Sequence, residues 1–152
     1  MRVVIVGSYS LSEMEVEPLV TSILSTMVDK YTKLRIIATD CDRGVGKLIK
    51  NSCLPPEPRG GKPRFCLEEM ALRIYSTGPE LTSAERAALL KPRNAYLAEV
   101  GEEFHIIFGT EGVHGMMGDL YHRLMDQYGA LVATYTSTDT EIKEPKKFSS
   151  PK

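Results

Sequence analysis

Two apolar runs, RVVIVGS at residues 2–8 and LRIIAT at residues 34–39, decide the fold that this sequence predicts. A short continuous apolar run is typical of a strand buried on both faces of a parallel sheet. Between the runs, apolar residues recur at steps of three and four, the pattern of a helix with one packed face: Val16, Leu19, Val20, Ile23, Leu24, Met27, Val28 and Tyr31. Ser12 and Glu15 have the spacing of a capping box at its start. We therefore expect a right-handed strand–helix–strand unit.

The rest of the chain continues this alternation. We expect a short helix through Cys53, a proline-rich loop at 54–63, a helical turn around 65–70, strands at 72–76, 104–108 and 130–135, and a helix at 117–128. A further helix should begin near Thr82, break at Pro92 and restart as a second segment. The sequence thus predicts an α/β protein with one Rossmann-like domain at residues 1–136, built on a doubly wound, mostly parallel five-stranded sheet. Residues 137–152 are polar and predict a mobile C-terminal tail.

Composition excludes several classes of protein. The 152 residues carry a net charge of -1, which gives no broad electrostatic footprint for DNA or RNA. No apolar run approaches the roughly 20 residues of a membrane helix. The three cysteines lack metal-site and disulfide spacing, and no two histidines are spaced as metal ligands. We expect a cytoplasmic protein with no metal, no cofactor and no membrane partner.

Gly7, Ser8 and Tyr9 follow the first strand and form the first candidate binding turn. A glycine directly after a strand lets backbone amides approach a ligand, and a nearby helix start favours an anion. The alternative is a tight turn in which Ser10 or Ser12 caps the helix. The turn lacks the third glycine of the dinucleotide fingerprint.

Asp42, Arg43 and Gly44 follow the second strand and form the second candidate. Arg43 is suited to a phosphate, the glycine amides to lining it, and Asp40 or Asp42 to accepting hydrogen bonds from ribose hydroxyls. In the alternative interpretation, Asp42 caps the next helix and Arg43 is a solvated charge.

Gly109, Thr110, Glu111 and Gly112 follow the strand at 104–108 and form the third candidate. Their glycines permit close approach of backbone to a ligand, and a Glu111 buried against apolar walls would have a raised pKa suited to acid or base catalysis. The alternative for Glu111 is an ordinary solvated glutamate. His105, inside the strand, is expected to be a satisfied core or edge residue.

Arg93 and Asn94 are the fourth candidate. We expect them in the first turn of a helix, where the helix dipole disfavours a cation, so Arg93 is a hint of a bound anion. The alternative is a surface salt bridge to Glu99 or Glu102.

Four short motifs resemble the SLOG superfamily, which includes LOG-type nucleotide phosphoribohydrolases, DprA-type DNA-processing domains and YspA-like proteins. They are Val-Ile-Val-Gly-Ser at 4–8, Thr-Asp-Cys-Asp-Arg-Gly-Val-Gly at 39–46, Pro-Arg-Asn at 92–94 and Phe-Gly-Thr-Glu-Gly at 108–112. The YspA-like branch is the most similar in length and motif order, and the resemblance covers residues 1–136. It implies a nucleotide-type ligand held by the turns at Gly7, Arg43 and Gly109, with Arg93 nearby.

The family's Pro-Gly-Gly-x-Gly-Thr-x-x-Glu signature is not intact. Val113 stands three residues beyond Thr110, where the family has its glutamate, and Gly46 replaces the acidic residue often found after the Arg-Gly turn. Both departures weaken the prediction of an enzyme more than that of a binding protein.

Three hypotheses of function follow. The first is a nucleotide-binding sensor or sequestering module without chemistry. The second is an enzyme acting on the N-glycosidic bond of nucleoside monophosphates, in which Glu111 stabilises the oxocarbenium-like centre or activates water and Arg93 holds the phosphate. The third is a DprA-like role on single-stranded DNA, which the acidic balance and few aromatic residues disfavour. By resemblance we also expect a homo-oligomer.

Overall fold

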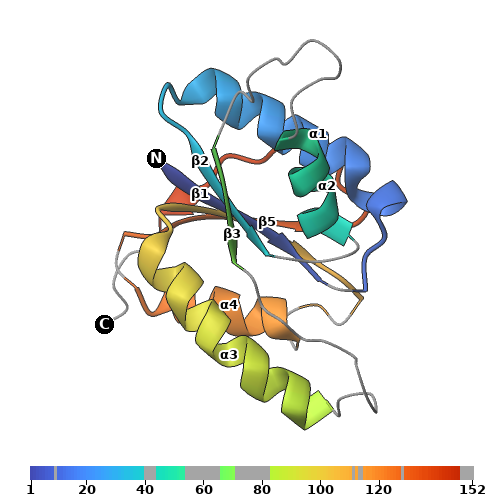
Figure 1. Ribbon diagram of the computed structural model, residues 1–152, viewed down its shortest axis with the longest axis vertical. Helices are drawn as coiled ribbons and strands as arrows, with labels where there is room; N and C mark the ends of the chain where they lie inside the picture. The colour runs from blue at the N-terminus through green and yellow to red at the C-terminus, as the bar shows by residue number, and fades with distance from the viewer. Residues whose placement is uncertain are drawn as a thin grey trace.

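The protein is an α/β structure with a single, mostly parallel sheet (Figure 1). The structure is a computed structural model that describes residues 1–8, 10–39, 44–53, 66–70, 83–110, 112, 115–127 and 129–147. The sheet order is β3-β2-β1-β4-β5-β6. Its first five strands in chain order run parallel and the sixth is short and antiparallel: β1 (Arg2–Gly7), β2 (Arg35–Thr39), β3 (Cys66–Met70), β4 (Glu103–Phe108), β5 (Leu131–Thr136) and β6 (Lys146–Lys147).

Helices cover both faces of the sheet. Helices α1 (Glu13–Lys30) and α2 (Gly44–Cys53) lie on one face, and α3 (Ser83–Val100) and α4 (Met116–Met125) lie on the other, as Figure 1 shows. The predicted α/β class with one mostly parallel sheet covered on both faces is therefore confirmed and is compatible with a Rossmann-like fold. The described sheet has five parallel strands and, in addition, the short antiparallel β6, which the sequence did not predict.

Strand β1 shows why the first apolar run decides the fold. Its residues Val3, Val4, Ile5 and Val6 are all fully or almost fully buried. Val3 and Ile5 belong to the core on the α1 side, whereas Val4 and Val6 belong to the core on the α3 side. Because successive side chains of a strand point to opposite faces, a run without polar residues requires cover on both sides.

Helix α1 forms as its sequence predicts. The side chain of Ser12 accepts a hydrogen bond from the Glu15 amide, and the Glu15 carboxylate accepts one from the Ser12 amide, which completes the capping box. The predicted apolar stripe faces the sheet and supplies six buried side chains: Val16, Leu19, Val20, Ile23, Leu24 and Met27. Val28 and Tyr31 pack against the same core and are partly buried.

Two predictions of local structure are wrong. Residues 66–70, expected within a helical turn, form strand β3, which pairs in parallel with β2. Helix α3, expected to break at Pro92, continues through it as one 18-residue helix. The strand expected at 72–76 lies outside the described residues.

The continuity of α3 also corrects the placement of Arg93 and Asn94. Both lie in the middle of the helix rather than in a first turn. The argument that a cation there opposes the helix dipole therefore fails, because the dipole acts mainly within the first and last turns.

Residues 137–147 run back along the sheet. Asp139 accepts a hydrogen bond from the Thr136 amide at 2.8 Å, Ile142 packs against the core on the α1 side, and β6 pairs with β5. We call residues 137–147 the strap. The sequence predicted no packed structure here, because only one large aliphatic side chain marks the segment.

Candidate functional site

The strand order reverses between β1 and β4, and this pair of strands defines the candidate site. The chain leaves β1 toward α1 on one face and leaves β4 toward α4 on the other. At the carboxyl ends of the two strands, Gly7 pairs with Ile107 and the Ser8 amide donates to the Ile107 carbonyl at 3.0 Å. Open α/β sheets bind ligands in the crevice formed at such a switch point.

Ser8 forms a tight turn at this position. It is buried, with 7% of its surface exposed, and its hydroxyl is 2.9 Å from that of Ser10. The Ser8 carbonyl accepts a hydrogen bond from the Leu11 amide at 3.1 Å. The hydroxyl and the carbonyl of Ser8 thus form hydrogen bonds within the turn itself, as the alternative interpretation expected. Tyr9 lies outside the described residues.

Two glycines at this edge have clear packing reasons. A Cβ on Gly7 would meet the Val45 Cγ2 atom at 2.4 Å, so the glycine lets α2 approach β1 closely. Gly44 has a φ of +75°, which favours glycine, and a Cβ there would meet the Leu11 carbonyl oxygen at 2.9 Å. The start of α2 therefore packs directly against the turn that follows β1.

The carboxylate of Glu13 reaches the start of α2. Hydrogen bonds from its own amide and from that of Gly44 lower the pKa of Glu13, and Lys47, whose Nζ is 3.6 Å from Glu13 Oε1, adds to the effect. A ligand phosphate at the first amide of α2 would compete with this carboxylate. Sequence reasoning missed Glu13, although an acid in a first helical turn is a common signal. Asp40, Asp42 and Arg43 lie outside the described residues.

The turn after β4 is more open. The Gly112 amide donates to the Gly109 carbonyl at 3.0 Å, and Thr110 between them is exposed. Gly112 has a φ of +58°, and no atom among the described residues would lie within 4 Å of a Cβ at this position. Gly115, the N-cap of α4, has no side chain to cap the helix. No described atom therefore fills the space next to Gly112, whereas Glu111 lies outside the described residues.

Arg93 and Asn94 lie at the contact between α3 and α4. Asn94 is fully buried, and its Nδ2 donates to Asp119 Oδ2 at 3.0 Å, as does Arg123 Nε. Burial alone would raise the pKa of Asp119, but these two donors hold it below its ordinary value. Asn94 thus ties the two helices together. Arg93 is also buried, with Nη2 3.4 Å from Asn94 Oδ1, rather than at the surface as its alternative interpretation expected.

The structure therefore brings Gly7, Ser8, Gly44, Gly109 and Thr110 to one edge of the sheet, whereas Arg93 lies in the middle of α3. Gly7, Ser8 and Gly44 meet through direct contacts. Gly109 and Thr110 follow the strand paired with β1, and Asn94 reaches the first turn of α4 through Asp119. We call the carboxyl ends of β1 and β4 with these turns the rim.

A second polar cluster lies away from the rim, buried on the α1 side of the sheet. The Nε2 atom of His105 is 2.7 Å from Glu103 Oε2, its Nδ1 atom is 2.8 Å from the Tyr135 hydroxyl, and Tyr31 donates to the other oxygen of Glu103. Glu103 and His105 are completely buried. The prediction that His105 is a satisfied core residue is confirmed.

Sequence reasoning missed the role of Glu103. It places the strand at 104–108, so Glu103 falls just outside it. A glutamate and a histidine two residues apart lie on the same face of a strand, and this spacing is the signal that could have found the pair. Burial alone would raise the pKa of Glu103, but hydrogen bonds from His105 and Tyr31 keep it below its ordinary value.

Further chemistry can be assessed for the described part of the chain. It holds no group of three His, Cys, Asp or Glu residues placed to bind a metal ion. Over the same residues, no helix combines the length and apolar character needed to span a bilayer. Comparison of the chain with protein-family models, with curated proteins and with solved structures finds no match.

Proposed function

We propose that this protein binds a nucleotide or a nucleotide-derived small molecule at the rim, as a sensor or sequestering module. The observation that carries the proposal is the reversal of strand order between β1 and β4, with a turn directly after each strand. In this interpretation the fold is Rossmann-like, and the resemblance of residues 1–136 to the SLOG superfamily supports the same class of ligand.

The two sides of the rim suit different parts of such a ligand. On the α2 side, the Glu13 carboxylate already accepts a hydrogen bond from Gly44, so this side favours hydroxyl donors over a second anion. On the α4 side, no described atom lies within 4 Å of a Cβ at Gly112, and α4 begins after Gly115 without a side chain that caps it, which suits a phosphate. We therefore place the sugar toward Glu13 and the phosphate toward Gly112.

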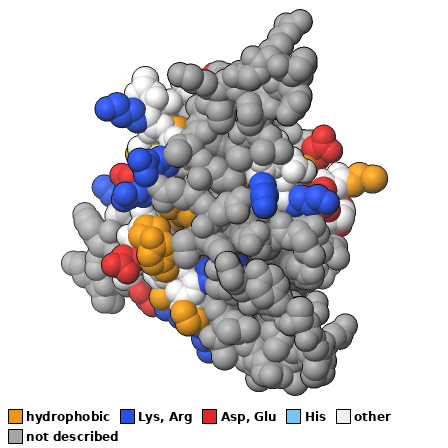
Figure 2. Space-filling view, in the orientation of Figure 1, with side chains coloured by type: hydrophobic (Ala, Val, Ile, Leu, Met, Phe, Trp, Pro, Cys, Tyr) orange, Lys and Arg blue, Asp and Glu red, His pale blue; other side chains and the backbone are white. Residues whose placement is uncertain are grey.

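The net charge of -1 supports a small ligand over a nucleic acid. On the face shown in Figure 2, the Lys and Arg side chains of the described residues are interspersed with Asp and Glu. A protein that follows a phosphate backbone needs a continuous basic stripe.

The test compares two variants that differ by one charge. Asn and Asp both tolerate a positive φ, so Gly112→Asn and Gly112→Asp should fold alike. A carboxylate about 5 Å from a phosphate in water costs ~0.8 kcal/mol per unit charge, which weakens binding about fourfold per ligand charge. We expect calorimetric titration with a panel of nucleoside monophosphates to give binding to the wild type and to Gly112→Asn, and weaker binding to Gly112→Asp.

Small molecules released from freshly purified, denatured protein should be identified by mass spectrometry in parallel, because they define the panel. Absence of any bound or co-purifying nucleotide would contradict the proposal. Equal affinity of the Asn and Asp variants would contradict the placement of the phosphate. Release of free base from a monophosphate would instead favour the N-glycosidase hypothesis.

A further inference from the structure

The helices that begin at the rim differ in how their first turns are capped. Helix α1 follows β1, α2 follows β2 and α4 follows β4, so these three helices start at the carboxyl edge of the sheet. The first backbone amides of a helix have no partner within the helix and attract an anion, unless another group of the protein already accepts their hydrogens. The caps therefore decide where the negative charge of a ligand is accepted.

Two of these helix starts are occupied by side chains of the protein itself. In α1, the capping box of Ser12 and Glu15 supplies the acceptor for an amide of the first turn. In α2, the Gly44 amide donates to the carboxylate of Glu13, which reaches across from the first turn of α1. Gly115, the N-cap of α4, offers no side chain for this role. A phosphate therefore competes with oxygen atoms of the protein at α1 and α2, but with no N-cap side chain at α4.

The packing of the turn after β1 holds Glu13 in this position. The Leu11 amide donates to the Ser8 carbonyl at 3.1 Å, and a Cβ on Gly44 would come within 2.9 Å of the Leu11 carbonyl oxygen. The starts of α1 and α2 are therefore in direct contact, and Glu13 lies two residues beyond Leu11. Of the Glu13 side chain, 33% remains exposed. A ligand at the rim can therefore reach this carboxylate.

The carboxylate of Glu13 has capacity for a further donor. Its own amide and that of Gly44 donate to it, and Lys47 Nζ lies 3.6 Å from its Oε1 atom. An ionised carboxylate has about four lone-pair sites and no hydrogen to donate, so it can accept from another hydroxyl but repels a phosphate oxygen. The ion pair with Lys47 does not remove this preference, because 49% of the Lys47 side chain is exposed and solvent screens the pair.

We propose that Glu13 determines the specificity of the rim by binding the 2′ and 3′ hydroxyls of a ribose, so that the ligand is a ribonucleotide whose phosphate is confined to the α4 side. This specificity rests on the proposed function, since it requires a nucleotide at the rim. The two hydroxyls lie on neighbouring carbon atoms of the sugar, so both can donate to one carboxylate. A deoxyribose lacks one of these donors, and a phosphate at either position brings a charge of the same sign as that of Glu13.

Three ligands test the proposal by calorimetric titration: the best-binding 5′-monophosphate among the ribonucleosides of the four common bases, its 2′,3′-dideoxy counterpart and its 3′,5′-bisphosphate. A hydrogen bond to a charged acceptor contributes about tenfold or more to affinity, so the dideoxy form should bind the wild type weaker by this factor. A phosphate about 5 Å from a carboxylate in water loses about fourfold in affinity per unit charge. The bisphosphate should therefore bind about fifteenfold more weakly than the monophosphate, because its second phosphate is close to a dianion.

Two variants separate recognition of the sugar from capping of α2. In Glu13→Gln, the amide oxygen of the new side chain can still accept from Gly44, so the cap remains while the charge is lost. The preference for ribose over dideoxyribose should fall, and the penalty on the bisphosphate should shrink by about fourfold per unit of ligand charge. Glu99 is exposed near the end of α3, at the opposite edge of the sheet. Glu99→Gln removes the same charge far from the rim and should leave both affinity ratios unchanged.

The NMR shift of the Glu13 carboxyl carbon in the wild type provides a second measurement, which does not need a variant. It should move on addition of the ribonucleotide and stay in place with the dideoxy form. Equal affinity of the wild type for these two ligands would overturn the proposal. Affinity ratios that are unchanged in Glu13→Gln would also overturn it and would assign Glu13 to capping alone. Binding of none of the ligands would contradict the proposed function itself, and the role of Glu13 with it.

Discussion

The close contact between Gly7 and α2 leads to a sharp prediction for Gly7→Ala. The added Cβ would lie 2.4 Å from Val45 Cγ2 and 3.2 Å from Val45 Cβ, whereas carbon atoms prefer separations of about 3.5–4.0 Å. A rotamer change moves Cγ2 but leaves Cβ in place, and a valine in a helix has one dominant rotamer. The start of α2 must therefore shift, and such overpacking costs about 1–3 kcal/mol.

Urea denaturation followed by far-UV circular dichroism measures this cost. With a slope of about 1–3 kcal/mol per molar urea, a loss of ~2 kcal/mol lowers the midpoint by about 1 M. Val45→Ala alone should also destabilise the protein, because it removes two buried carbon atoms at about 0.8 kcal/mol each. In the double variant the alanine methyl at position 7 fills part of the space that Val45 vacates. The double variant should therefore lose less stability than the sum of the two single variants.

The same set of variants distinguishes packing from ligand binding at Gly7. If the two single costs simply add, or if Gly7→Ala is as stable as the wild type, the packing explanation is refuted. If Gly7 also provides close approach to a ligand, the double variant should regain stability while nucleotide binding stays weak.

Two further predictions concern carboxylates whose pKa is lowered by hydrogen bonds from neighbouring side chains. The folded-state pKa of Glu103 lies below its ordinary value of 4.5, so ionised Glu103 contributes its full stabilisation above about pH 4.5 and loses it as the pH falls toward the folded-state pKa. Glu103→Gln should therefore have a free energy of unfolding at pH 7 that is about 1–3 kcal/mol lower than that of the wild type. Below pH 4.5 its urea midpoint should fall less steeply with pH than the wild-type midpoint. Equal slopes in the two proteins would contradict this prediction. Asn94→Ala should lower the free energy of unfolding by about 1–3 kcal/mol and raise the pKa of Asp119 toward its ordinary value. NMR titration of the carboxyl carbon measures this pKa. An unchanged pKa would show that Asn94 does not control it.

The parts of the fold that the sequence predicts correctly are those in which local pattern and packing agree. In α1, the capping box and the apolar stripe mark the same helix, so the start and the buried face are both correct. The run at 2–6 is apolar on both faces because helices cover both faces. In these segments the local sequence pattern is sufficient to predict the structure, because the residues that form the pattern are also the residues that pack in the core.

The incorrect parts have identifiable physical causes. Among the described residues, strand β3 ends the sheet and pairs with β2 only. It contains two consecutive glutamates, so it shows no apolar run or clear alternation. Polar side chains are common on such edge strands. In α3, Pro92 removes one backbone hydrogen-bond donor, and a prediction from local sequence therefore ends the helix at this residue. Packing of Leu97, Ala98 and Asn94 on the far side of the proline keeps the helix continuous.

The candidate site was predictable in position but not in detail. The alternation of strands and helices predicts a site at the carboxyl ends of the strands, and the strand order seen in the structure places the turns after Gly7 and Phe108 side by side. The close contact of α2 with Gly7, and the position of Glu13 at the start of α2, depend on the angle between helix and sheet. No sequence pattern encodes that angle, so the packing role of Gly7 became visible only in three dimensions.

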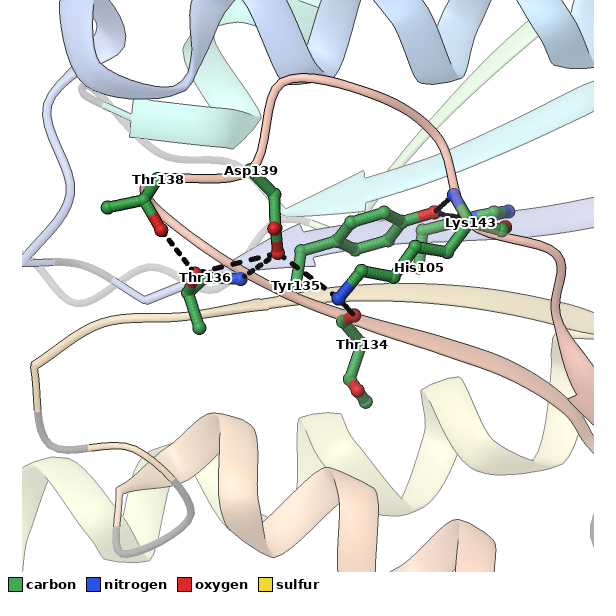
Figure 3. A network of polar contacts seen from close by, with 7 residues as sticks. All are labelled: His105, Thr134, Tyr135, Thr136, Thr138, Asp139 and Lys143. Carbon is green, nitrogen blue, oxygen red and sulfur yellow. Dashed lines mark hydrogen bonds and ion pairs between the residues drawn. The ribbon is translucent and has the colours of Figure 1, made fainter.

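The buried polar cluster has a role that stability alone does not explain. Ionic and hydrogen-bonded groups in a core are often replaceable by apolar residues at no loss of stability. Strand β6, however, has only two residues, both exposed lysines, and a polar strand specifies its register weakly. The Lys143 amide and the Tyr135 hydroxyl meet three residues before β6, and the hydroxyl is in turn oriented by His105 and Glu103. This directional contact (Figure 3) adds to the register that the two residue pairs of β6 specify only weakly.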